Sequence, residues 1–170
     1  NGTGSTFRRR FSPTPFIPEK SESCMRYEEI FAIQATALAR RIEHTHSDTA
    51  VIGVSGGLDS TLALLVTVKA FDILGKEREG IIAITMPGFG TTGRTYNNAL
   101  ALMSRLGVKQ KEISIKEACL QHFKDIEHNA EMHDVTYENS QARERTQILM
   151  DIANKHNGLV IGTGDMSELA

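Results

Sequence analysis

The chain has 170 residues, of which 19 are Lys or Arg and 21 are Asp or Glu, so its formal net charge is −2 with neutral histidines. This near-neutral balance argues against a protein that binds nucleic acid by charge, because such proteins usually carry a basic surplus. No apolar run approaches the roughly 20 residues of a membrane-spanning helix. The polar, proline-broken N-terminal stretch lacks the core of a signal peptide, and Cys24 and Cys119 are too few for a disulfide framework. We expect a soluble cytoplasmic protein with no nucleic-acid or membrane partner.

Residues 1–20 are rich in Gly, Ser, Thr and Pro and show no hydrophobic period, which predicts an arm or linker ahead of one domain over residues 21–170. An amphipathic helix is expected over residues 22–46, because side chains that form a partly apolar stripe recur there at spacings of three and four. The stripe comprises Tyr27, Ile30, Phe31, Gln34, Leu38, Arg41 and Ile42. This helix is expected to pack on the outside of the domain.

Short apolar runs then alternate with helical patterns along the rest of the chain. Strands buried on both faces are predicted at residues 50–54, 81–84 and 159–161, with a more polar, edge-like strand at 111–115. Helices are predicted at residues 61–74, 94–106, 116–128 and 138–156. Strands that alternate with helices predict an α/β fold with a doubly wound parallel sheet and right-handed crossovers.

The segment after the first of these strands reads Ser55-Gly56-Gly57-Leu58-Asp59-Ser60. A buried strand leads into a Ser/Gly-rich turn and a helix starts at once, which is the context of an anion site, because unpaired N–H groups and the helix dipole favour negative charge there. Ligands of open α/β sheets bind beyond the carboxyl ends of the strands. A plain turn with Asp59 or Ser60 as the helix cap is the alternative. The two glycines and two hydroxyls between buried flanks favour a phosphate loop.

This loop matches neither the G-x-x-x-x-G-K-[ST] pattern nor the dinucleotide pattern G-x-G-x-x-G. Asp59 is its unusual member, because a carboxylate beside a polyphosphate is repulsive unless a cation lies between them. Mg²⁺ fits that position, since it is held by one or two carboxylates together with phosphate oxygens. The loop resembles the pyrophosphate loop of the ATP pyrophosphatase group, whose members cleave ATP between the α and β phosphates and adenylate an acceptor oxygen.

The helix predicted over residues 138–156 carries Arg145 within its apolar arc. The arc comprises Ala142, Leu149, Ile152 and Ala153. An inward arginine needs a partner, and its planar fork suits phosphate or carboxylate. Two interpretations stay open at this point: an anionic ligand, or a structural salt bridge with Glu138. Arg143 is expected to face solvent.

A third segment with polar side chains follows the last predicted strand. Thr163 can donate a hydrogen bond to a phosphate oxygen, and Glu168 can be a second metal carboxylate opposite Asp59. Asp165 and Glu168 are three residues apart and also fit a helix-capping box, which is compatible with the metal role.

Four segments together resemble the synthetase domain of glutamine-dependent NAD synthetases, from about Pro15 to the last residue. They are residues 55–60, 86–92, 137–146 and 162–170. In that family ATP adenylates the nicotinate carboxylate of nicotinic acid adenine dinucleotide (deamido-NAD), and ammonia then displaces AMP to give NAD. Residues 91–95 lack the acidic stretch usual in the ammonia-only branch, which implies the glutamine-fed branch.

The resemblance implies a role for each matching residue. The ATP site would comprise Gly53, Val54, Ser55, Gly56, Gly57, Leu58, Asp59, Ser60, Met86, Arg145 and Thr163. Asp59 and Arg145 would be catalytic, and Asp59 and Glu168 would hold Mg²⁺. Asn139 and Glu168 would contact deamido-NAD.

The resemblance also implies partners: a homo-oligomer, and a glutaminase domain outside this chain that supplies ammonia. It implies a domain truncated on its C-terminal side, because the family continues beyond the segment that matches residues 162–170 with further strands and a lysine. Two other functions stay open: another amidating ATP pyrophosphatase such as a GMP synthetase, and a non-catalytic adenine-nucleotide sensor.

Overall fold

The computed structural model describes residues 13–15, 17–18, 21–90 and 93–164. Its described strands form one parallel sheet with the order β3-β2-β1-β4. The strands are β1 (Thr49–Gly53), β2 (Ile81–Thr85), β3 (Lys109–Glu112) and β4 (Gly158–Ile161). The helices are α1 (Ser23–His44), α2 (Leu58–Leu74), α3 (Gly93–Leu106), α4 (Lys116–Asp125) and α5 (Val135–Lys155), with a short 3-10 turn, η1, at Arg78–Gly80.

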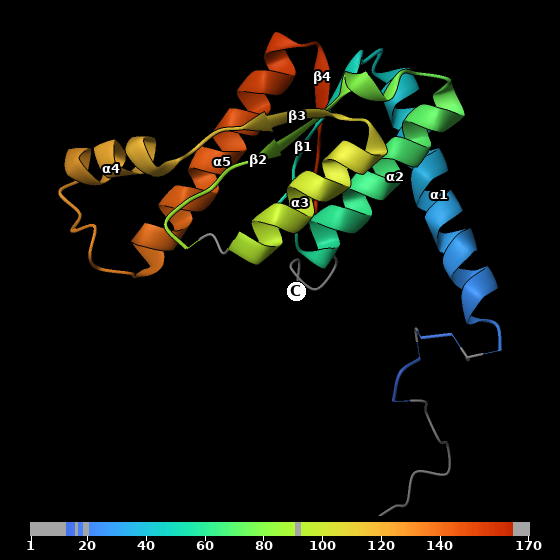
Figure 1. Ribbon diagram of the computed structural model, residues 1–170, viewed down its shortest axis with the longest axis horizontal. Helices are drawn as coiled ribbons and strands as arrows, with labels where there is room; N and C mark the ends of the chain where they lie inside the picture. The colour runs from blue at the N-terminus through green and yellow to red at the C-terminus, as the bar shows by residue number, and fades with distance from the viewer. Residues whose placement is uncertain (1–12, 16, 19–20, 91–92, 165–170) are drawn as a thin grey trace, which may run out of the picture.

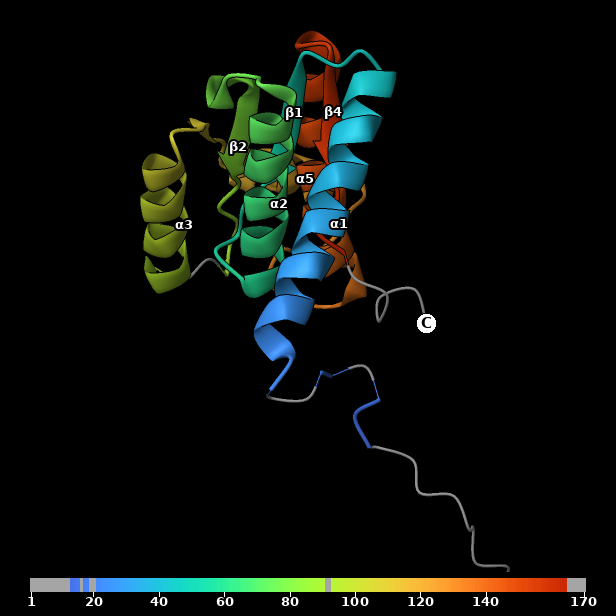
Figure 2. The ribbon, with the colours of Figure 1, turned by 90° about the vertical axis from the view of Figure 1, so that its right-hand side faces the viewer.

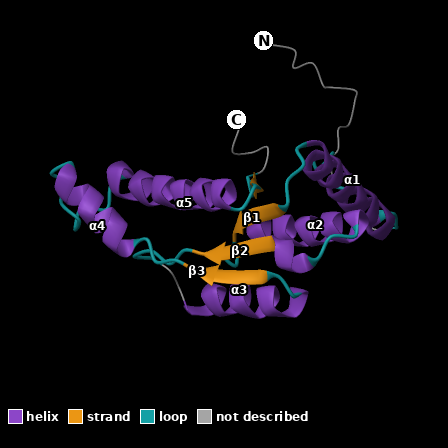
Figure 3. Ribbon diagram, turned by 90° about the horizontal axis from the view of Figure 1, so that it is seen from above, coloured by secondary structure: helices purple, strands orange, loops and turns teal. Residues whose placement is uncertain are grey.

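Helices cover both faces of this sheet, so the predicted doubly wound α/β fold is confirmed (Figure 1). Helices α2 and α3 lie on one face, with α1 packed against α2, and α5 lies on the other face with α4 beside it (Figure 3). Among the described helices, none combines the length and the apolar composition that a bilayer crossing requires.

Alternate residues of the central strand β1 supply two separate cores, because successive strand side chains point to opposite faces. Ala50 and Ile52 belong to the core shared with α1, α2 and α3. Val51 belongs to the core shared with α5, together with Ile82 and Val160, its register partners on β2 and β4. Burial on both faces explains why β1 and β2 are continuously apolar.

The strand order places a topological switch point between β1 and β4. The chain moves outward from β1 to β2 and β3 and then returns to add β4 on the other side of β1. Ligands of open α/β sheets bind at such a point, beyond the carboxyl ends of the strands. The phosphate loop after β1 and the segment after β4 therefore both leave the sheet at its ligand-binding edge.

Helix α1 is buried only in its C-terminal half, against α2. Ala35, Ala39 and Ile42 are buried, whereas Tyr27 and Ile30 are 54% and 48% exposed. Of the predicted stripe, Ile42 is buried and Phe31 and Leu38 are half-buried, whereas the prediction is wrong for the exposed Tyr27, Ile30, Gln34 and Arg41. For Tyr27 and Ile30 the cause is that α1 extends past the end of α2, where no described element covers its first turns (Figure 2).

The element boundaries differ from the predicted ones where polar residues make the first or last turn. Helix α2 begins at Leu58 rather than residue 61. Helix α5 begins at Val135 rather than residue 138, because the Asp134 side chain caps it by accepting a hydrogen bond from the backbone N–H of Tyr137 at 3.0 Å. These first turns mix polar and apolar side chains, so their apolar periodicity is incomplete even though Ser60 and Tyr137 are buried. The edge strand is confirmed, but at Lys109–Glu112.

Candidate nucleotide site

The loop between β1 and α2 is a tight turn held by its own backbone and hydroxyls. The Val54 N–H donates to the Ile84 carbonyl oxygen at 2.9 Å, which ties the start of the loop to β2. The Ser55 Oγ accepts from the Gly57 N–H at 3.3 Å and lies 3.2 Å from the Ser60 Oγ, which in turn donates to the Gly57 carbonyl oxygen at 3.2 Å. These short-range bonds fix the loop ahead of the helix.

Gly57, not Asp59 or Ser60, is the N-cap of α2, and it provides no side-chain cap. The simple capping interpretation of the loop is therefore wrong. The first N–H to find an acceptor within the helix is that of Thr61, which donates to the Gly57 carbonyl oxygen at 3.1 Å. The N–H groups of the preceding residues 58–60 have no acceptor within the helix. A cap-free helix start of this kind suits an anion.

Gly56 is required by both its backbone and its surroundings. Its φ of +87° lies in the left-handed region, which disfavours other residues. A Cβ at this position would lie 2.1 Å from the carbonyl oxygen of Thr95, in the first turn of α3. The loop therefore meets the backbone of α3 directly.

The remaining loop residues lie at different depths. Leu58 is 87% exposed and Asp59 is also exposed, whereas Ser60 is buried. Gly53, the last residue of β1, packs closely against α5 and the end of β2, since an added Cβ would lie 3.1 Å from the Met86 Cε. The carboxylate of Asp59 thus stands at the open side of the helix start, where a hard oxygen ligand suits Mg²⁺.

A pocket of about 360 Å³ lies next to this loop, at the carboxyl ends of β1 and β2. Of the residues predicted to bind ATP, it brings together Val54, Ser55, Met86 and Arg145. The other lining residues are Thr85, Pro87, Gly90, Thr95 and Tyr96. Pro87 and Gly90 fall in residues 86–92, one of the four segments that carry the family resemblance, whereas sequence reasoning missed Thr85, Thr95 and Tyr96. Their position at the end of β2 and in the first turn of α3 is the signal that would have pointed to them.

Arg145 reaches the pocket from α5 and is half-buried. Its Nε donates to the carbonyl oxygen of Met86 at 3.4 Å. An added Cβ on Gly88 would lie 2.8 Å from its terminal guanidinium nitrogen, so the chain after β2 passes closely over it. Glu138 is exposed, and the described residues include no ion pair to Arg145. The salt bridge with Glu138 is therefore not formed.

The predicted apolar arc of α5 is wrong at its N-terminal end. Leu149 and Ile152 pack against the core on the α5 face and Ala153 is buried in it, but Ala142 is exposed. The first turns of α5 extend beyond the carboxyl edge of the sheet, where no strand lies beneath them (Figure 1). Arg145 lies near this boundary, which is why it is only half-buried.

Asn139 lies outside the nucleotide pocket. It is exposed on α5 and lines a separate shallow hollow with Arg143. The other lining residues of the hollow are Ala142, Thr146 and Gln147. Arg143 faces solvent as predicted, but the structure adds that it shares the hollow with Asn139.

Thr163 is half-buried, two residues after Ile161, which pairs with Ile52 of β1. Asp165 and Glu168 lie outside the described residues.

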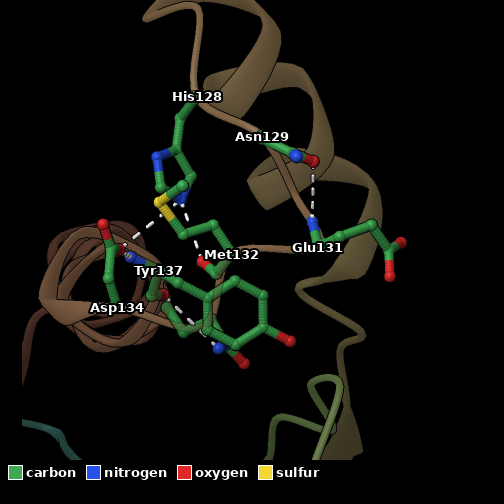
Figure 4. Close-up of polar contacts among 7 residues, drawn as sticks. His128, Asn129, Glu131, Met132, Asp134 and Tyr137 are labelled. Atoms are coloured by element: carbon green, nitrogen blue, oxygen red, sulfur yellow. Dashed lines mark hydrogen bonds and ion pairs between the residues drawn. The ribbon is translucent and has the colours of Figure 1, made fainter.

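An aromatic cluster supports the α5 wall of the pocket from the side of α4. The rings of Phe89 and Phe123 lie 5.6 Å from that of Tyr137. The chain between α4 and α5 is tied to the start of α5 by His128, whose Nε2 lies 3.2 Å from the Met132 carbonyl oxygen and 3.5 Å from a carboxylate oxygen of Asp134 (Figure 4). Through these contacts the cluster positions the first turns of α5.

The α4–α5 side offers no activated thiol for covalent chemistry. Cys119 of α4 is 1% exposed, and burial raises the pKa of its thiol. A thiol with a raised pKa is a poor nucleophile at neutral pH. Cys24 is exposed, and both cysteines are free.

The parallel sheet, the cap-free loop after β1 and the adjoining pocket define an α/β protein of the ATP pyrophosphatase fold. A family model described as NAD synthase matches residues 30–170. The chain belongs to the NAD synthase family.

Known relatives agree with this assignment. The chain is 43% identical over 160 residues to the glutamine-dependent NAD(+) synthetase of Mycobacterium leprae, covering 91% of this chain and 24% of that protein. It is 33% identical to the NH3-dependent NAD(+) synthetase of Pyrobaculum aerophilum, covering 84% of this chain and 52% of that protein. A solved glutamine-dependent NAD+ synthetase from Acinetobacter baumannii, in complex with ADP, superposes with a TM-score of 0.77 at 30% identity, over 84% of this chain and 26% of that one. The chain thus spans about a quarter of the glutamine-dependent relatives.

Proposed function

We propose that the protein carrying this chain is a NAD synthetase. It amidates deamido-NAD to NAD through an adenylated carboxylate, consuming ATP and releasing AMP and pyrophosphate. The observation that carries the proposal is the pocket that joins Ser55 of the phosphate loop to Arg145 of α5 at the carboxyl ends of β1 and β2. Membership of the NAD synthase family supports the same reaction.

The residues of the loop supply what phosphoryl transfer needs, which is mostly positioning and neutralisation of charge. The N–H groups at the cap-free start of α2 bind the phosphates that become pyrophosphate. Arg145, whose fork is oriented by the Met86 carbonyl oxygen, stabilises charge that develops near the α-phosphate. The Ser55 and Ser60 hydroxyls, which lie 3.2 Å apart, and Thr163 complete the donors.

Asp59 and Glu168 would hold Mg²⁺, and the exposed Asp59 carboxylate at the start of α2 fits that role. The ion, when bound, neutralises phosphate charge. The change Asp59→Asn should weaken Mg²⁺–ATP binding about tenfold or more while it leaves metal-free AMP binding nearly unchanged, because only the first ligand needs the carboxylate. Isothermal titration calorimetry with both ligands tests this, and equal effects on the two would remove Asp59 from the metal site.

The acceptor dinucleotide is assigned to Asn139 and Glu168. The exposed hollow that holds Asn139 and Arg143 supports a second ligand surface on α5, the helix that also carries Arg145. Ammonia is proposed to come from glutamine through a glutaminase domain outside these 170 residues. The higher identity to the glutamine-dependent relative supports that source. A homo-oligomer in the cytoplasm completes the proposal.

Product analysis tests the function directly. The protein carrying this chain is incubated with ATP, Mg²⁺ and ammonia or glutamine, with and without deamido-NAD, and AMP, ADP and NAD are measured. AMP and NAD that appear only with deamido-NAD support the proposal. AMP formed with xanthosine monophosphate indicates a GMP synthetase, and nucleotide binding without any AMP indicates a sensor. ADP as the product contradicts the assignment of the loop.

A further inference from the structure

The pocket beside the phosphate loop has an aromatic wall to which the proposed chemistry gives no role. Tyr96, the fourth residue of α3, lines the pocket together with Met86 and Pro87. Helix α3 lies on one face of the sheet, whereas α5, which carries Arg145, lies on the other (Figure 3). The pocket is therefore enclosed by both helical layers at the carboxyl edge of the sheet.

Tyr96 is held at two points. On its backbone side, the neighbouring Thr95 carbonyl oxygen abuts Gly56 of the phosphate loop, which fixes the first turn of α3 against that loop. At its far end, the Tyr96 hydroxyl donates a hydrogen bond to a carboxylate oxygen of Glu112, the last residue of β3. This bond also raises the pKa of the Tyr96 phenol, which is consistent with its role as the donor. A ring anchored at both ends loses little further freedom when a ligand packs on it.

The chemistry of the walls fits a flat ring joined to an anion. Tyr96 offers an aromatic face, and Met86 and Pro87 add apolar surface, with sulfur that packs favourably on aromatic rings. Ser55, in the same lining, belongs to the loop that suits phosphate. A volume of about 360 Å³ lies within the range of small-ligand sites. The ligand class that combines a flat base with phosphates is a nucleotide.

We propose that Tyr96 is a base-stacking residue of this pocket and that Glu112 is a positioning residue that holds its ring through the hydroxyl. The inference rests on the proposed function only in taking ATP as the nucleotide. Stacking on an aromatic ring tolerates any base, because every base has a π-face. Tyr96 therefore contributes affinity for the base and leaves binding of the phosphates to the loop.

The test compares ATP with inorganic pyrophosphate, which carries the phosphates but no base. Binding of each is measured by isothermal titration calorimetry for the whole protein that carries this chain and for its variants. The change Tyr96→Ala should weaken ATP binding about tenfold and leave pyrophosphate binding within twofold, because only the stacking contact is removed. Tyr96→Phe keeps the ring and should restore most of the ATP affinity. Glu112→Ala removes the acceptor of the Tyr96 hydroxyl and should weaken ATP binding but not pyrophosphate binding, and unchanged ATP binding would overturn its positioning role. Tyr27→Ala, an exposed tyrosine on α1, is the matched control and should change neither ligand.

Tyr96→Leu, which keeps apolar bulk without the aromatic face, covers the case in which Tyr96→Ala fails to fold, and circular dichroism verifies each variant. Unchanged ATP affinity in Tyr96→Ala or Tyr96→Leu overturns the proposal. Equal weakening of ATP and pyrophosphate also overturns it, because the residue would then act by supporting the loop. The outcome is separate from the proposed function, since a protein that forms no NAD but binds ATP through Tyr96 refutes the reaction and supports the stacking role.

Discussion

The two sides of the nucleotide pocket are built in different ways. The β1–α2 side is the phosphate loop, in which Gly56, Gly57 and two serine hydroxyls shape the backbone within six residues. The α5 side depends on parts far apart in the chain, because Arg145 is oriented by Met86, 59 positions away, and α5 itself is braced by the aromatic cluster with α4. The first side therefore depends on a few residues, with α3 as its outer contact, whereas the support of Arg145 is spread over many contacts.

The largest loss of ATP affinity is expected from a change within the phosphate loop. The change Gly56→Ala should lower ATP affinity more than about 100-fold and the free energy of unfolding by about 2 kcal/mol, because it adds left-handed strain and a clash with the Thr95 carbonyl oxygen. The control is Gly75→Ala, at a φ of +64° with nothing within 4 Å of an added Cβ. It should cost about 1 kcal/mol of strain and leave ATP binding unchanged. Urea denaturation and calorimetry measure both, and equal losses would mean that the α3 contact is unimportant.

The next largest loss of ATP affinity is expected from a change at Arg145 of α5. The change Arg145→Ala should weaken ATP binding about 30-fold, the size expected for lost hydrogen bonds to a charged group. Arg145→Lys should recover only part of it, because an ammonium lacks the planar fork. Arg143→Ala is the matched control, since Arg143 is on the same helix but lines the other hollow. A comparable loss of ATP binding in Arg143→Ala would contradict the separation of the two surfaces on α5.

A smaller effect on ATP affinity is expected when the N-terminus of α5 is destabilised. Removing the cap of α5 with Asp134→Ala should lower the free energy of unfolding by about 1 kcal/mol, while Asp134→Asn, which retains a capping oxygen, should change it little. ATP affinity should change less than threefold in both, because other contacts still hold α5. A loss of ATP binding as large as that in Arg145→Ala would show that the support is concentrated at this one residue.

The smallest effect is a difference in thiol reactivity between the two cysteines, which reports on local opening of the contact between α4 and α5. At pH 8 a thiol reagent should modify the exposed Cys24 quickly and Cys119 slowly, because Cys119 is 1% exposed and burial raises its thiol pKa. The rate at Cys119 rises with pH as the thiolate forms. Asp134→Ala should speed modification of Cys119 about fivefold, in line with about 1 kcal/mol of local stability. Peptide mass spectrometry over time measures each rate, and equal rates at the two cysteines would contradict a closed α4–α5 side.

The same contrast explains how much of the site could be predicted from the sequence. The parallel sheet and the phosphate loop follow from local patterns, a buried strand, glycines and an abrupt helix start, which act over a few residues. The helical pattern predicts Arg145 as an inward arginine, but its contact with Met86 depends on how α5 crosses the sheet edge. The spacing of apolar residues does not single out Tyr96, because its place in the pocket depends on its hydrogen bond to the distant Glu112 and on the contact of its neighbour Thr95 with Gly56.

The errors at the ends of helices have one physical origin. Periodicity assumes that an apolar face is covered along its whole length and by one neighbour. Tyr27 and Ile30 are exposed because α1 runs beyond α2 (Figure 2). At the start of α5 the buried side is the one that carries Tyr137 and Gln141, and Ala142 is exposed. The length of a helix relative to its neighbours is a property of the assembled fold. It is not encoded in the spacing of the side chains.

The direct contact between Gly56 and the first turn of α3 has a consequence for transplanting this loop. A graft of residues 53–60 into another α/β sheet would carry the hydroxyls and glycines but not the α3 backbone that limits the loop from outside. The transferable unit is the loop together with the strand β2 and the start of α3, segments that follow it in sequence by some 40 residues at the contact. A designer who transplants only the sequence motif should obtain a turn with the same residues but a poorly defined backbone conformation.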